Sequence, residues 1–112
     1  MITPDIIVQI AKSYIGITEI TPNAGFSCPV FEAEMRSIGW LPSHPWCTYF
    51  VELVYTKAYA ETEWGQLIGK LFSGYALITL KNMKSYGFDI SDYPVTGSIA
   101  IWQHGFTDTG HA

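Results

Sequence analysis

The feature that most constrains this chain is an apolar stripe in its middle, placed directly after a stretch that cannot be helical. Pro42 and Pro45 each disfavour helix in the residue before them, so regular structure must break between residues 41 and 45. Neither glycine nor proline interrupts the next fifteen residues, in which apolar side chains recur with a period of about 3.6: Trp46, Tyr49, Phe50, Leu53, Val54 and Ala58. We therefore predict a central helix over residues 46–60.

Shorter helices are predicted on both sides of the central one. A proline at the first helical position and a glycine after the last turn bound two of them: residues 4–15, with Thr3 as N-cap before Pro4 and Gly16 behind, and residues 29–38, between Cys28 and Gly39. Weaker helical patterns occupy residues 64–72 and 77–86, and the latter ends at Gly87.

Residues 98–102 are the only convincing strand. They follow a turn, Pro94 to Gly97, and they are apolar on both alternating faces, which is typical of a strand covered on both sides. A single strand cannot satisfy its own backbone N–H and C=O groups, so further strands must pair with it. We predict an α+β fold, with the helices packed on a small antiparallel sheet. We also expect residues 1–112 to be a single domain truncated at its C-terminus, with most strands beyond residue 112 or in a second chain.

Composition excludes several classes of function. Ten acidic and six basic side chains, a net charge of −4, are scattered without runs, so no basic face is expected that could bind nucleic acid. No segment approaches the roughly 20 apolar residues that cross a bilayer, and the N-terminus lacks the basic region of a signal peptide. Aromatic residues make up 15% of the chain, which favours a binding groove lined by rings.

Cys47 is the first candidate for chemistry, because it falls in the first turn of the central helix. Ser43 or His44 is the expected N-cap. Unpaired N–H groups and the helix dipole favour thiolate over thiol at this position, and the same N–H groups could bind an oxyanion. A small buried hydrophobe is an equally good interpretation of Cys47, and Cys28 also lies near a helix start. A disulfide between the two cysteines is disfavoured, because two cysteines do not make a disulfide framework.

A nucleophilic cysteine needs a base, and the chain has three histidines: His44, His104 and His111. His44 lies only three residues before Cys47 and suits a cap or surface position better. A hairpin after the strand would bring His111 back toward the central helix, and the spacing alone leaves His104 as an alternative. Cys47 and the histidines could instead bind zinc, but their spacings match no closed structural site, so no metal or cofactor is expected.

Several short motifs occur in an order that resembles one enzyme family. They are Glu19, Asn23-Ala24-Gly25, Pro45-Trp46-Cys47-Thr48-Tyr49-Phe50-Val51, Pro94-Val95-Thr96-Gly97-Ser98-Ile99-Ala100-Ile101-Trp102 and Gly110-His111-Ala112. This set resembles the cysteine, histidine-dependent amidohydrolase/peptidase (CHAP) family of the NlpC-like, papain-like cysteine peptidases. In that family a Trp-Cys-Ala-x-Phe-Val segment opens the nucleophile helix, Pro-x-x-Gly-Asp leads into the first core strand, and Gly-His-Val begins the second.

The resemblance implies a function and the residues for it. Cys47 would be the nucleophile and His111 the general base, while a third polar residue would follow beyond residue 112. The candidate cleft residues are Glu19, Asn23, Trp46 and Trp102. The substrate would be an amide bond of bacterial peptidoglycan, either between N-acetylmuramic acid and L-alanine or within the stem or cross-bridge peptide. The protein would act at the cell wall, with phage or wall-associated proteins as further partners.

Departures from the family pattern leave alternatives open. Ser98 stands where the family has Asp, which is expected to remove a structural hydrogen bond without affecting the chemistry. Surface aromatic rings would suit stacking on sugars, although core packing is the favoured interpretation for each: Trp40, Trp46, Trp64 and Trp102. A non-catalytic wall-binding or structural module, and a cysteine-dependent acyltransferase or deamidase of the same fold, are the competing functions.

Overall fold

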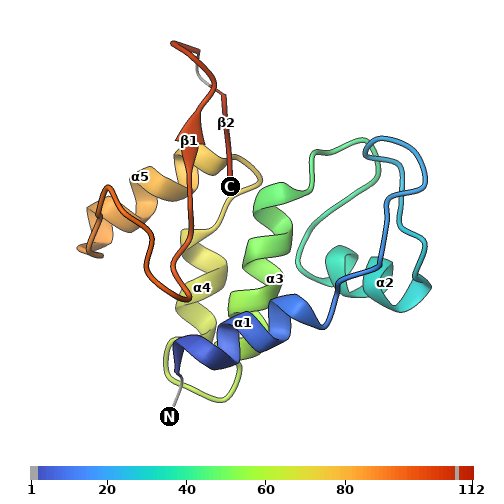
Figure 1. Ribbon diagram of the computed structural model, residues 1–112, viewed down its shortest axis with the longest axis horizontal. Coiled ribbons are helices and arrows are strands. Elements are labelled where there is room, and N and C mark those ends of the chain that lie inside the picture. Colours follow the sequence, from blue (N-terminus) through green and yellow to red (C-terminus); the bar gives the residue numbers. More distant parts are fainter. Residues whose placement is uncertain (1–2, 108) are drawn as a thin grey trace.

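The computed structural model describes residues 3–107 and 109–112 (Figure 1). Within these residues the chain forms five helices and one two-stranded sheet: α1 (Pro4–Lys12), α2 (Pro29–Ser37), α3 (Cys47–Tyr59), α4 (Gly65–Leu71), α5 (Ala76–Tyr86), β1 (Trp102–Gln103) and β2 (Gly110–His111). Helix α3 is central, because α1, α2 and α4 all pack on it, whereas α5 packs on α4 and supports the hairpin. The predicted combination of helices with a small antiparallel sheet is confirmed at this level.

Helix α1 begins as predicted and ends early. Thr3 is the N-cap and Pro4 the first helical residue, but the helix ends at Lys12 instead of residue 15. Beyond Ser13 the backbone hydrogen bonds span three residues, as in the bond from Tyr14 N to Ala11 O, and the Ser13 hydroxyl donates to Ile10 O at 2.6 Å. This tighter turn closes the helix before the chain reaches Gly16.

The other helices follow the predicted pattern with shifted ends. Helix α2 opens at Pro29 behind its N-cap, Cys28, and α5 ends at Gly87, whose φ of +105° suits glycine. The N-cap of α3 is Trp46, so the prediction of Ser43 or His44 is wrong. Ser43 instead adopts φ +77° and donates its backbone N–H to Asn23 at 2.6 Å, which ties that residue into the preceding loop.

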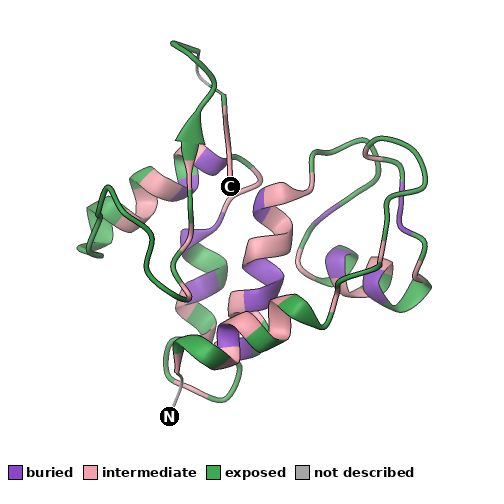
Figure 2. Cartoon of the chain, in the orientation of Figure 1, coloured by how far each residue is buried: buried purple, intermediate pink, exposed green. Residues whose placement is uncertain are grey.

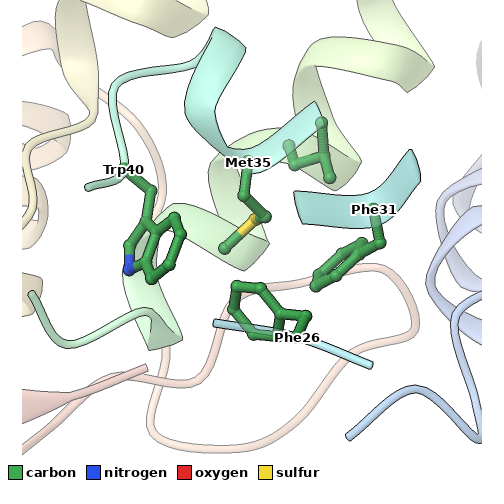
Figure 3. Close-up of a cluster of buried hydrophobic side chains, with 5 residues drawn as sticks. Phe26, Phe31, Met35 and Trp40 are labelled. Carbon is green, nitrogen blue, oxygen red and sulfur yellow. The ribbon is translucent and has the colours of Figure 1, made fainter. Parts of the chain in front are cut away.

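The core lies mainly where α2 meets α3. Five buried side chains form it, and Figure 3 shows Met35 and Phe26 between Trp40 and Phe31: Phe26, Phe31, Met35, Trp40 and Leu53. Trp40 is fully buried and donates its indole N–H to the carbonyl of His44, so of its two interpretations core packing is confirmed. A second cluster joins Ile7 of α1 to Val54 and Ala58 of α3, whose buried positions are purple in Figure 2.

The sheet is shorter than the predicted strand. Strands β1 and β2 pair antiparallel, with Trp102 opposite His111, while residues 98–101 are irregular. Ser98, Ala100 and Trp102 are exposed, so the prediction of a strand covered on both faces is wrong. The reason is that β2 is the only pairing partner within the described residues, and it meets the chain at Trp102.

The predicted turn before this segment is confirmed. Ser98 N–H donates to Val95 O at 2.9 Å, and the Ser98 hydroxyl donates to the same carbonyl at 2.6 Å. The serine therefore supplies a hydrogen bond within the turn. Gly97 has φ +80° and packs against Pro4, and its carbonyl accepts a hydrogen bond from the Tyr55 hydroxyl, which fixes the turn on α1 and α3.

Candidate active site

Cys47 is the first residue of α3, in the first helical turn as predicted. The N-cap residue makes no side-chain hydrogen bond to the helix, and within the described residues the N–H groups of Cys47, Thr48 and Tyr49 have no acceptor. The thiol is half-buried and lies 3.6 Å from the hydroxyl of Thr48, which is itself 1% exposed. A thiol, a hydroxyl and a set of free N–H donors thus meet at one helix terminus.

Three of the four candidate cleft residues lie together beside this terminus. The Glu19 carboxylate oxygen Oε2 accepts hydrogen bonds from the Trp46 indole at 2.9 Å and from the backbone N–H of Asn23 at 3.0 Å. These bonds, first that from Asn23 and then that from Trp46, lower the pKa of Glu19 below its ordinary value. Glu19 is therefore a charged acceptor at neutral pH. Its hydrogen bond to Trp46, the residue before Cys47, links it to the start of α3.

His111 lies in the hairpin, on strand β2. Its ring meets that of Trp102 with centroids 4.7 Å apart, and it is half-buried, whereas His44 and His104 are exposed. His104 Nδ1 lies 3.3 Å from the Thr109 hydroxyl in the hairpin loop. The predicted hairpin is therefore present, and of the three histidines His111 is the most enclosed.

The hairpin and the first turn of α3 both contact residues 74–77, which lead into α5. A Cβ at Gly110 would lie 2.8 Å from the Leu77 side chain, and a Cβ at Gly74 would lie 2.6 Å from the Tyr49 hydroxyl, so both contacts are close. Strand β2 packs on α5. Within the described residues the Cys47 thiol has one hydrogen-bonding neighbour, the Thr48 hydroxyl, and no bond joins it to His111.

Two cavities lie in the described part of the chain. A cavity of about 840 Å³ opens between α4, α5 and residues 88–102, and Trp102 is the one predicted site residue in its wall. A cavity of about 210 Å³ is lined by apolar and aromatic side chains together with Glu19 and Trp46. Neither Cys47 nor His111 lines either space, so both catalytic candidates lie outside these two cavities.

The described residues offer neither a metal-binding cluster nor a membrane-spanning helix. In residues 3–107 and 109–112, no three acidic, histidine or cysteine side chains gather where they could bind a metal ion. Cys47 and the three histidines are therefore not clustered as a metal site would require. Over the same residues, none of the helices has the length and apolarity needed to cross a membrane.

The sequence patterns did not single out two polar residues of α3. Thr48 and Glu52 lie one turn apart, and both are buried, with Glu52 7% exposed. Burial raises the pKa of Glu52 to about 7. Their spacing of four residues on a largely apolar helix was the available signal, because it puts both polar groups on one interior face.

Comparisons with known proteins add no relative. The chain matches no protein-family model, no characterised protein and no solved structure. The residues at the start of α3 and the hairpin that carries His111 are therefore the features from which a function can be inferred.

Proposed function

We propose that the protein is a peptidoglycan amide hydrolase, an N-acetylmuramoyl-L-alanine amidase or a peptidoglycan endopeptidase, with Cys47 as nucleophile and His111 as general base. The observation that carries this proposal is the position of Cys47 at the first residue of α3, beside three N–H groups without acceptors in the described residues. A helix start of this kind stabilises both a thiolate and the oxyanion of a tetrahedral intermediate. The protein would act at the bacterial cell wall.

The reaction would take two steps. The Cys47 thiolate attacks the amide carbonyl carbon, a C–S bond forms, and the oxyanion accepts hydrogen bonds from the first-turn N–H groups. The C–N bond then breaks while the His111 imidazolium gives its proton to the departing amine. In the second step His111 takes a proton from water, the hydroxide attacks the thioester, and the Cys47 thiolate leaves with the carboxylic acid product free.

The proposal requires a papain-like arrangement around this helix. In such an arrangement the nucleophile helix packs against the sheet strand that carries the histidine, and the two side chains meet across the interface. Apo structures commonly have long or poorly aligned catalytic hydrogen bonds that shorten with substrate bound. A Cys47–His111 hydrogen bond formed on substrate binding is therefore part of the proposal.

A non-catalytic wall-binding module is the second candidate. It is favoured by the exposed aromatic rings of Trp64, Tyr93 and Trp102, which line the cavity of about 840 Å³. Aromatic faces of this kind suit stacking on sugar rings without turnover. In this case wall binding would depend on Trp102 and would be indifferent to Cys47.

One experiment separates the two functions. Purified peptidoglycan is incubated with the wild-type chain, Cys47→Ala, and the matched control Cys28→Ala, and newly released amino groups are counted. Hydrolysis requires release by the wild type and by Cys28→Ala but not by Cys47→Ala. The binding module would be established instead by two results together. None of the three proteins releases amino groups, and the wild type pellets with the insoluble wall whereas Trp102→Ala does not.

A further inference from the structure

Trp46 connects the candidate nucleophile to the rest of the fold. It is the N-cap residue of α3, and its side chain makes no cap hydrogen bond to that helix. Instead the indole N–H donates to Glu19 at 2.9 Å, and the ring packs edge-on against Phe26 and Phe50, with centroids 5.5 and 6.4 Å away. The start of α3 is therefore held through the side chain of Trp46 and not through a conventional cap.

Glu19 is itself held rigidly by a small hairpin formed by residues 18–27. Backbone hydrogen bonds close this hairpin, from Ile20 N to Gly25 O at 2.9 Å and from Ser27 N to Thr18 O at 2.7 Å. The N–H of Asn23 bonds the Glu19 carboxylate within it. The carboxylate that receives the Trp46 indole is thus fixed by the backbone around it.

The same hairpin contacts the segment before α3 a second time. The carbonyl of Asn23 accepts the N–H of Ser43 at 2.6 Å, and both residues have positive φ, +60° and +77°. Asparagine tolerates left-handed backbone, whereas serine seldom adopts it, so the conformation of Ser43 persists only where surrounding contacts impose it. Two hydrogen bonds, Glu19–Trp46 and Asn23–Ser43, therefore hold residues 43–46 against the hairpin.

We propose that Glu19 is a positioning residue for Cys47, acting by holding the Trp46 indole and so fixing the first turn of α3. A helix start whose N–H groups lack side-chain caps frays readily, and its N–H groups then lose the common direction that a thiolate or an oxyanion needs. The proposal rests on the proposed function only in taking Cys47 as the reactive group. The oxygen of Glu19, and not its charge, performs this role.

The geometry distinguishes the oxygen from the charge. Both hydrogen bonds end on the same atom, Oε2 of Glu19. A glutamine at this position can place its amide oxygen where Oε2 lies and accept both bonds, although it carries no charge. Glu19→Gln should therefore keep the first turn of α3 in place, whereas Glu19→Ala should release it.

The test measures thiol reactivity in the folded chain carrying Cys28→Ser, so that Cys47 is the one thiol. The rate of iodoacetamide labelling is followed by mass spectrometry at pH 7 and at pH 9.5, where a thiol of ordinary pKa is mostly ionised. Glu19→Ala and Trp46→Phe, which keeps the ring but lacks the N–H, should each lower the ratio of the rate at pH 7 to that at pH 9.5 about fivefold, the effect of losing one hydrogen bond.

Controls are available within the same chain. Glu19→Gln, and Glu61→Ala at an exposed glutamate, should leave the ratio within twofold of the parent. The double variant Glu19→Ala/Trp46→Phe should be no worse than either single variant, because both remove the same bond. Far-UV circular dichroism verifies folding, and if Glu19→Ala does not fold, Trp46→Phe and Glu19→Gln still decide the outcome.

Three results would overturn the proposal: unchanged ratios in Glu19→Ala and Trp46→Phe, effects that multiply in the double variant, or a Glu19→Gln ratio as low as that of alanine. The last would assign the effect to charge. Peptidoglycan hydrolysis is measured separately on the same variants. If the labelling ratios follow the expected pattern while no variant releases amino groups, the proposed function fails and the positioning by Glu19 stands.

Discussion

The buried carboxyl group of Glu52 offers a test of the core that does not depend on function. Only 7% of the residue is exposed, and burial is what raises its pKa from 4.5 to about 7. The folded state therefore disfavours the charged carboxylate relative to the unfolded chain. We expect Glu52→Gln, which keeps the shape of the neutral acid, to stabilise the protein at pH 8.

The magnitude follows from the difference between the two pKa values, about 2.5 pH units. Each unit corresponds to about 1.4 kcal/mol, which makes about 3.4 kcal/mol the upper value. The Glu52 carboxylate makes no hydrogen bond within the described residues, and no side-chain oxygen there is both fully buried and unpaired. Water therefore still reaches the Glu52 carboxylate and weakens the effect. The expected gain in the free energy of unfolding at pH 8 is therefore about 2 kcal/mol.

The sign of the pH dependence is specific. Between pH 4.5 and 7 the folded chain keeps the Glu52 proton while the unfolded chain loses it, so wild-type stability falls as the pH rises through this window. Urea unfolding of wild type and Glu52→Gln at pH 4, 6 and 8 measures the difference, with Glu61→Gln as the exposed control. The advantage of Glu52→Gln should be near zero at pH 4 and largest at pH 8. A difference independent of pH, or a loss of stability at pH 8, would refute the reasoning.

Other perturbations have equally definite expectations. Trp40→Ala empties a fully buried site and should lower the free energy of unfolding by about 3–5 kcal/mol in urea titrations; a cost below 1 kcal/mol would mean that Trp40 is not in the core. Gly97→Ala places a Cβ 3.1 Å from Pro4 at φ +80° and should cost at least about 1 kcal/mol in thermal unfolding, against no change if the turn is free to move. Cys47→Ala should abolish release of amino groups from peptidoglycan whereas Cys28→Ala retains it; equal activity of the two variants would contradict the assigned nucleophile.

The candidate site was only partly predictable from the sequence. The position of Cys47 followed from Pro45 and from the apolar stripe, because both act over a few residues. Glu19 could be named as a candidate but not given a partner, since its contact with Trp46 spans 27 positions in the sequence. The buried environment of Glu52 was also out of reach, because burial depends on how α3 packs against the other helices.

Local chemistry in the sequence by itself determined the five helices, the break before α3, the turn at Pro94 to Gly97 and the hairpin that returns at His111. Prolines, glycines and apolar spacing suffice for these features because each one depends on neighbours within a turn or two. Only the tertiary structure decided that Trp46 occupies the N-cap position of α3, that Trp40 is buried, and that residues 98–101 remain irregular. Those outcomes depend on which distant groups meet, and a strand forms only where another backbone supplies its hydrogen bonds.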